Sequence, residues 1–145
     1  MGGELRFCIP GEVRGKGRPR ATAVNGQARM FTDSKTRSYE TRIADAATAA
    51  LGQRPPLEGP LEMHIRVRLV PPASTPKKAR VLMIAGSLMP TKKPDLDNVL
   101  KAILDGCNKI AFQDDVLVVK FSAVKIYADV SGVDVLIRPY IQKAP

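Results

Sequence analysis

The most informative stretch of this sequence is Lys92-Lys93-Pro94-Asp95-Leu96-Asp97-Asn98-Val99-Leu100-Lys101-Ala102-Ile103-Leu104-Asp105. Pro94 cannot occupy a helix interior and disfavours the helical conformation of Lys93, so a helix is predicted to begin directly after it. Apolar residues then recur at intervals of three and four, which is typical of one buried helix face. They are Leu96, Val99, Leu100, Ile103, Leu104 and Cys107. The pattern predicts a core helix.

Acidic residues accompany this helix in an otherwise basic chain. Asp95 and Asp97 are placed at its first turn, and Asp97, Lys101 and Asp105 follow at i, i+4 and i+8, so they share a face roughly opposite the apolar stripe. Each has an ordinary explanation as well: an aspartate at a helix start is a good N-cap, and Asp97 with Lys101 is a common surface pair.

A second acidic pair, Asp114-Asp115, lies about ten residues further on, directly before the apolar run Val116 to Val119. It marks the entry to a predicted strand. A simple turn role for these aspartates is the alternative.

Length and charge restrict the class of protein. A chain of 145 residues can form one domain with a core of its own. The net charge of +9 and the pI near 9.9 favour a polyanionic partner, nucleic acid above all, although ribosomal and membrane-surface proteins share this composition.

The two cysteines, Cys8 and Cys107, have no zinc-site spacing and are expected to be reduced and buried. With no signal peptide and no long apolar run, we expect a cytoplasmic protein with no membrane partner. His64, the sole histidine, alternates onto the polar face of a predicted strand and has no partner nearby in sequence, which favours a strand-surface role over a general base.

Basic residues concentrate near the N-terminus. In Arg14-Gly15-Lys16-Gly17-Arg18-Pro19-Arg20 every second residue is a cation, so an extended segment would line Arg14, Lys16, Arg18 and Arg20 along a phosphate backbone. Between positions 12 and 42, eight Lys or Arg stand against three acids, which is +5 of the total +9. A solvated basic loop without a specific task is the alternative.

The remaining pattern predicts the architecture. Strands are expected at 5–9, 61–70, 116–127 and 133–140, the last two as a terminal hairpin, and helices at 38–51, with Ser38 as N-cap, and at 74–86. This order predicts an α/β (α+β) fold: a single domain, 1–145, with a mixed sheet of about four strands and helices packed on it.

The acids suit metal-assisted hydrolysis of a phosphodiester. Three carboxylates such as those of Asp95, Asp97 and Asp115 can hold Mg²⁺ through hard oxygen ligands and leave positions for water and phosphate. Lys101 could stabilise developing charge or orient the water.

The motif Pro-Asp-Leu-Asp-Asn-x-x-Lys-Ala-x-x-Asp at 94–105, followed by Phe112-x-Asp114-Asp115-x-x-Val118, resembles the RusA family of Holliday-junction resolvases. Lys16-Gly17-Arg18-Pro19-Arg20 and Thr36-x-x-Tyr39-Glu40 are similar to that family too, so the resemblance covers 5–138. It implies a small homodimeric, magnesium-dependent endodeoxyribonuclease of a kind frequent in prophages, with Mn²⁺ as an acceptable substitute. Such enzymes nick a four-way junction symmetrically, one strand per subunit.

Residue by residue, the resemblance implies metal-binding aspartates at Asp95, Asp97 and Asp115 and a catalytic lysine at Lys101, with Asp114 as an auxiliary acid. DNA-binding residues would be Arg14, Lys16, Arg18, Arg20, Lys92 and Lys93. Two positions depart from the family pattern: Lys92-Lys93-Pro94 stands where arginines often precede the first aspartate, and Leu117 stands where glutamine is frequent.

The leading hypothesis is therefore a Mg²⁺-dependent nuclease that resolves Holliday junctions in DNA recombination and repair. One alternative is a non-catalytic basic nucleic-acid-binding module whose acids only cap a helix and balance charge. The other is a metal nuclease acting on other branched DNA or on RNA, because local motifs do not encode branch recognition.

Overall fold

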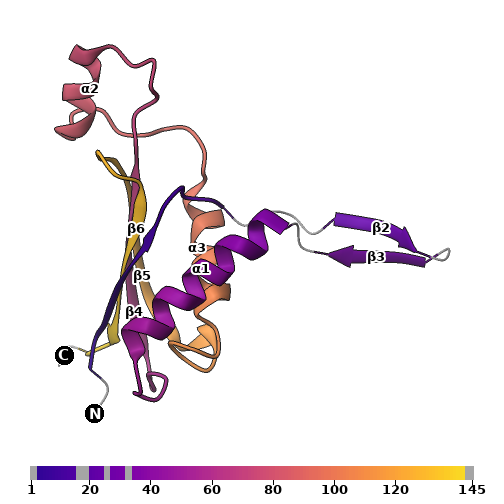
Figure 1. The fold of residues 1–145 in the computed structure, drawn as a ribbon. Coiled ribbons are helices and arrows are strands. Elements are labelled where there is room, and N and C mark those ends of the chain that lie inside the picture. The colour runs from indigo at the N-terminus through magenta and orange to yellow at the C-terminus, as the bar shows by residue number, and fades with distance from the viewer. Residues whose placement is uncertain (1–2, 16–19, 25–26, 32–33, 143–145) are drawn as a thin grey trace.

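A four-stranded mixed sheet forms the centre of the structure (Figure 1). The computed structural model describes residues 3–15, 20–24, 27–31 and 34–142. The strand order is β1-β6-β4-β5, in which β6 pairs antiparallel with both β1 and β4, and β4 pairs parallel with β5. The strands are β1 (Leu5–Pro10), β4 (Leu61–Leu69), β5 (Val118–Tyr127) and β6 (Gly132–Pro139). The predicted α+β class and the mixed sheet of about four strands are confirmed.

Two helices cover one face of this sheet, α1 (Ser34–Leu51) and α3 (Leu96–Cys107) (Figure 1). α3 begins directly after Pro94, as predicted, and its buried residues are Val99, Ala102, Ile103, Gly106 and Cys107. They pack with the inward residues of the sheet and of α1, among them Met63, Ile65, Val67, Val135, Ile137, Tyr39, Ile43 and Ala47. α1 starts four residues before the predicted N-cap Ser38, and Gly52, with φ of 63°, follows its last residue.

The predicted terminal hairpin is wrong, because β5 and β6 do not pair with each other. β4 lies between them. The connection from β5 to β6 passes the end of β4, where the Ala128 amide donates to the Leu69 carbonyl at 2.9 Å and Arg68 Nη1 donates to the Val130 carbonyl at 2.8 Å. Met63, Ile65 and Val67 bury the inner face of β4, which makes β4 a central strand that can accept a neighbour on each edge.

Two elements project from this core (Figure 1). The first is a hairpin of β2 (Arg20–Val24) and β3 (Gln27–Phe31), which the sequence analysis did not predict although Asn25-Gly26 is a strong hairpin-turn sequence. The second is α2 (Lys77–Ile84), a helix without a buried residue that exposes Val81, Leu82 and Ile84. The start of α3 lies between these two projections in Figure 1.

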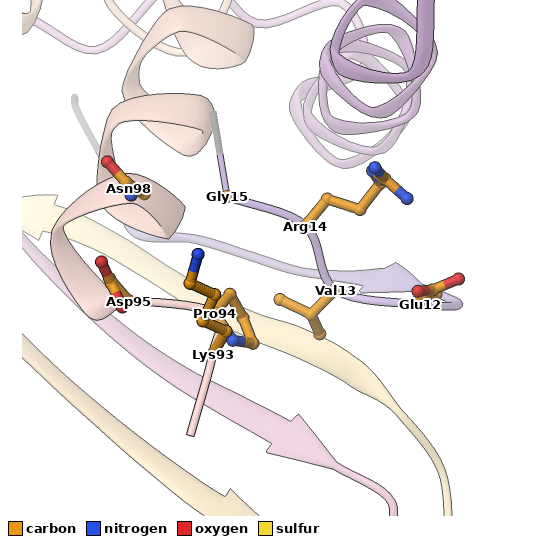
Figure 2. Close-up of a pocket in the computed structure, with 8 residues that line it drawn as sticks. All are labelled: Glu12, Val13, Arg14, Gly15, Lys93, Pro94, Asp95 and Asn98. Atoms are coloured by element: carbon orange, nitrogen blue, oxygen red, sulfur yellow. The ribbon is translucent and has the colours of Figure 1, made fainter. Parts of the chain in front are cut away.

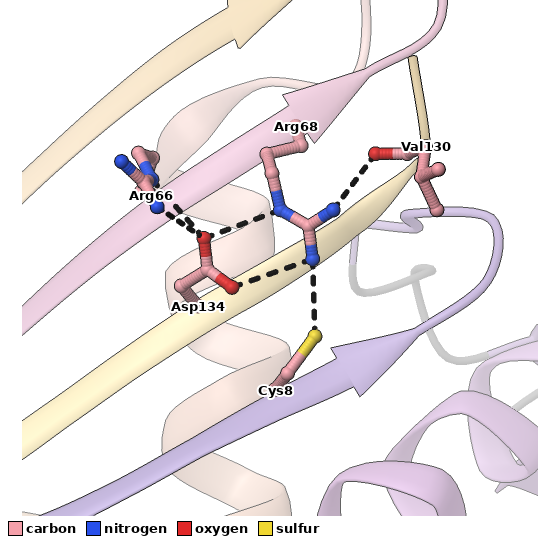
Figure 3. Close-up of polar contacts among 5 residues, drawn as sticks. All are labelled: Cys8, Arg66, Arg68, Val130 and Asp134. Atoms are coloured by element: carbon pink, nitrogen blue, oxygen red, sulfur yellow. Dashed lines mark hydrogen bonds and ion pairs between the residues drawn. The ribbon is translucent and has the colours of Figure 1, made fainter. Parts of the chain in front are cut away.

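The other face of the sheet carries a polar network instead of a helix layer. Asp134 accepts hydrogen bonds from Arg66 and Arg68, and Arg68 also donates to the Cys8 sulfur at 3.0 Å (Figure 3). The expectation of a buried thiol at position 8 is wrong, because Cys8 falls on the outward side of β1 and is exposed. Cys107 is buried as expected, and burial raises the pKa of its thiol to about 12.

His64 lies on this outward face too. Its Nδ1 is 2.5 Å from the Ser122 hydroxyl and its Nε2 is 3.7 Å from Glu62. A hydrogen bond from Arg138 holds the pKa of the Glu62 carboxyl below its usual range. Over the described ranges, no helix is long and apolar enough to cross a membrane.

Gly106 lies at a close contact between α3 and α1. A Cβ at this position would lie 2.6 Å from Cγ2 of Ile43 and 3.2 Å from the Glu40 carbonyl oxygen. Gly106→Ala is therefore expected to lower the free energy of unfolding by about 1 to 2 kcal/mol in urea titrations, since overpacking outweighs the gain in helix propensity.

Gly3→Ala is the matched control, because its added methyl makes only an ordinary contact with Arg54 at 3.6 Å. Equal unfolding midpoints for Gly106→Ala and Gly3→Ala would contradict the tight contact between the helices.

Candidate active site

Asp95 and Asp97 are held at the first turn of α3. Asp95 occupies the N-cap position with an extended backbone, and its carbonyl accepts the first helical hydrogen bond from the Val99 amide at 3.1 Å. Its side chain accepts no capping hydrogen bond. A capping role therefore does not account for the Asp95 carboxylate.

Lys125 of β5 holds the loop that precedes the first turn of α3. Lys125 Nζ, on β5, donates to the Lys92 carbonyl at 2.7 Å and to the Pro94 carbonyl at 3.1 Å. These two bonds tie the loop before α3 to the sheet, and so help to hold Asp95 in place.

Asp97 and Lys101 pair along the helix surface. Asp97 Oδ2 and Lys101 Nζ are 4.0 Å apart, with side chains 70% and 62% exposed. An ion pair this exposed contributes little to stability. Both groups are accessible to a ligand from solvent.

Asp115 lies near the other end of α3, in the 3₁₀ turn Asp115–Leu117 that precedes β5. Desolvation raises the pKa of its carboxyl, and so do a hydrogen bond with Asp114 and the nearby charges of Asp114 and Asp105. Asp114 itself caps the 3₁₀ turn, because its Oδ1 accepts from the Val116 amide at 3.1 Å. Asp114 thus has a structural task, whereas Asp115 is a carboxylate crowded by like charge.

Asp95, Asp97 and Lys101 therefore lie in the first half of α3, whereas Asp115 lies near Asp105, close to the other end of the helix. Asp97 and Asp105 are eight positions apart, which corresponds to about 12 Å along a helix axis. In the part of the chain that the structure describes, no three His, Cys, Asp or Glu side chains lie close enough together to hold a metal ion as they stand. The chemistry of the set fits Mg²⁺ nevertheless: the donors are all carboxylate oxygens, and the repulsion around Asp115 is what a cation would relieve.

Three of the six predicted DNA-binding residues, Arg14, Lys92 and Lys93, lie beside the first turn of α3. Lys92 and Lys93 are exposed just before it, and Arg14 lies beside it in a segment, residues 11–15, that we call the arm. Lys16 and Arg18 fall outside the described residues, and Arg20 is the first residue of β2.

Arg42 of α1 holds the arm in place. Its guanidinium donates to the carbonyls of Pro10 at 2.6 Å and Glu12 at 3.3 Å, and it lies 4.8 Å from the ring centroid of Tyr39. Burial raises the pKa of Tyr39 to about 12, although nearby Arg42 opposes the shift. Arg42 thus ties the start of the arm to α1.

Sequence reasoning missed three contributors to this region: Asp105 as the neighbour of Asp115, Lys125 as the anchor of the loop, and Arg42 as the anchor of the arm. Asp105 was visible as a member of the helix face that carries Asp97 and Lys101. The tasks of Lys125 and Arg42 depend on contacts between distant segments, for which no local pattern exists.

Comparison with known proteins gives two findings. A family model described as "Endodeoxyribonuclease RusA" matches residues 10–138. The chain is also 33% identical over 138 residues to a Bacillus subtilis (strain 168) protein named "Uncharacterized protein YqaN", an alignment that covers 92% of this chain and 95% of that protein.

Replacing Arg42 tests how firmly the arm is held. Arg42→Met is expected to lower the free energy of unfolding by about 1.5 kcal/mol, because it removes hydrogen bonds from a charged donor to two carbonyls. Urea unfolding measures the loss. Arg37→Met, at an exposed arginine of the same helix, is the control, and an equal loss in both variants would contradict an anchoring role for Arg42.

The crowding of Asp115 predicts a dependence of stability on pH. The pKa of its carboxyl is raised in the folded state, so ionisation of Asp115 at pH 7 lowers the stability of the fold. This loss of stability is absent at a pH low enough to protonate the carboxyl in both the folded and the unfolded chain. Asp115→Asn is therefore expected to raise the melting temperature in metal-free, low-salt buffer at pH 7, with a gain that disappears on acidification below about pH 4. A gain of the same size at both pH values would contradict electrostatic crowding at Asp115.

Proposed function

Because this chain belongs to the RusA endodeoxyribonuclease family, whose members are Holliday-junction resolvases, we propose that it is a Mg²⁺-dependent nuclease that resolves four-way DNA junctions by paired nicks. The observation that carries the proposal is the row of accessible carboxylates and one lysine along α3 within a chain of net charge +9. Acids placed beside Arg14, Lys92 and Lys93 disfavour the binding of DNA unless a cation is bound as well.

In this proposal Asp95, Asp97 and Asp115 hold Mg²⁺, with Mn²⁺ as a substitute, and Asp105 adds negative charge beside Asp115. The bound ion supplies an activated water and neutralises charge on the phosphate. Lys101, one turn after Asp97, stabilises the negative charge that develops on the phosphoryl oxygens as the phosphodiester is hydrolysed.

Lys92, Lys93 and the basic residues of positions 14–20 contact the phosphates on either side of the cut. These contacts supply affinity without sequence information. We further propose a homodimer, because one copy offers one row of acids and symmetric resolution requires a cut in each of two strands.

Asp97→Asn is the decisive substitution. It is expected to lower the rate of junction cleavage at least about 100-fold, the loss usual for ligands and their supporting groups, while Ca²⁺-supported binding is retained. The assay compares a synthetic four-way junction with linear duplex of the same arms and with an RNA junction, in Mg²⁺ or EDTA.

Asp45→Asn, at an exposed aspartate of α1, is the matched control and should cut like the wild type. Near-normal nicking by Asp97→Asn would exclude the proposed site. Binding without cleavage by every variant, the wild type included, would favour the non-catalytic binding module, and cleavage of the RNA or the linear DNA instead would reassign the substrate.

A further inference from the structure

A hollow opens directly beside Asp95, between the arm and the first turn of α3 (Figure 2). Its volume is about 380 Å³, within the range of sites that take small ligands. The arm forms one wall through residues 12–15, and Lys93, Pro94, Asp95 and Asn98 form the other.

The arm is seated against α3 by direct contact. A Cβ on Gly15 would lie 2.8 Å from the Cβ of Asn98, so only glycine allows this approach. On the opposite side a Cβ on Gly11 would lie 2.5 Å from Arg42 Nη1, the group that bonds to Pro10. Gly15 thus allows the close approach of the arm to α3 that forms one end of the hollow.

The lining combines four kinds of chemistry. Arg14 and Lys93 are cations suited to phosphate, Val13 and Pro94 are apolar, and Asn98 carries a side-chain amide with both donors and an acceptor. The carboxylates are those of Glu12 and of Asp95, the latter a proposed metal ligand. A nucleotide complements the first three features with an anionic group, an apolar ring face and a polar base edge. The position beside Asp95 places such a nucleotide next to the phosphate that would be cut.

We propose that this hollow receives a nucleotide adjacent to the scissile phosphate and that Asn98 reads the edge of its base, so that Asn98 determines which sequences at a junction are cut. The proposal rests on the proposed function for the identity of the ligand as DNA. Asn98 acts here as a specificity-determining residue, whereas Arg14 and Lys93 bind any sequence. An asparagine amide can form two hydrogen bonds to one base and discriminate against the others by about 5-fold to about 150-fold.

The test uses a pool of four-way junctions with constant arms and randomised base pairs at the crossover. The pool is bound in Ca²⁺ and the bound fraction is sequenced, and a second sample is cut in Mg²⁺ and its nicks are mapped. The wild type is expected to enrich one base at one position by about 5-fold or more. Asn98→Ala and Asn98→Ser should lose this enrichment, and both keep the Cβ that meets Gly15.

Two further variants separate base reading from general affinity. Arg14→Gln should weaken binding of all sequences by a common factor and leave the enrichment intact. Lys109→Gln, at an exposed lysine just beyond the other end of α3, should change neither.

No enrichment by folded wild type, or an enrichment that survives in both folded Asn98 variants, would overturn the proposal. The binding experiment in Ca²⁺ decides the role of Asn98 even if no junction is cut. A failure to cut would count against the proposed function alone.

Discussion

Burial of the apolar stripe of α3 is the constraint on which the rest of the arrangement depends. Val99, Ile103 and Cys107 are fully covered by α1 and the sheet, which fixes the rotation of the helix about its axis. Asp97 and Lys101 must then face solvent, because they lie on the opposite side of the same helix. The glycine at 106 brings the helix close enough to α1 for this packing to be tight.

Charge is organised around the same helix. The arm, held by Arg42 of α1 and in contact with Asn98 of α3, brings Arg14 to the start of a helix that carries acids along its length. Basic and acidic groups are thereby neighbours near the start of α3, and the pair that does form along the helix, Asp97 with Lys101, is weak and exposed. The outward face of the sheet differs in this respect, because Arg66, Arg68 and Asp134 bond to one another there (Figure 3).

The local elements could be predicted from sequence wherever one physical signal dominated. Pro94 and a stripe of period 3.6 were sufficient for α3, and strict alternation was sufficient for β4. The pairing of β5 with β6 was predicted wrongly because it depends on competition among strands: neighbours in sequence usually pair, but here β4 is the better partner for both. The β2–β3 hairpin was missed although the signal at Asn25-Gly26 was present.

The same distinction holds for the site. Pro94 locates Asp95 and Asp97 at a helix start, and this follows from local chemistry alone. That Asp115 is crowded by Asp105, and that Lys125 holds the Pro94 carbonyl, follow from tertiary packing. The hollow beside Asn98 depends on the close contact between Gly15 and Asn98, and no spacing in the sequence predicts that contact.

The parallel pairing of β4 and β5 has a kinetic consequence. Residues 70–117 form the crossover between these strands, and they contain α2, α3 and every candidate metal ligand. Closing a connection of this length is entropically slow, so β5 is expected to join the sheet late, after local elements have formed. β5 is also an edge strand, with a neighbour on one side only. Its transient detachment would release Lys125 from the carbonyls of Lys92 and Pro94 while β1, β6 and β4 remain paired, so the support of the loop before Asp95 can be lost by the opening of one edge without unfolding of the whole domain.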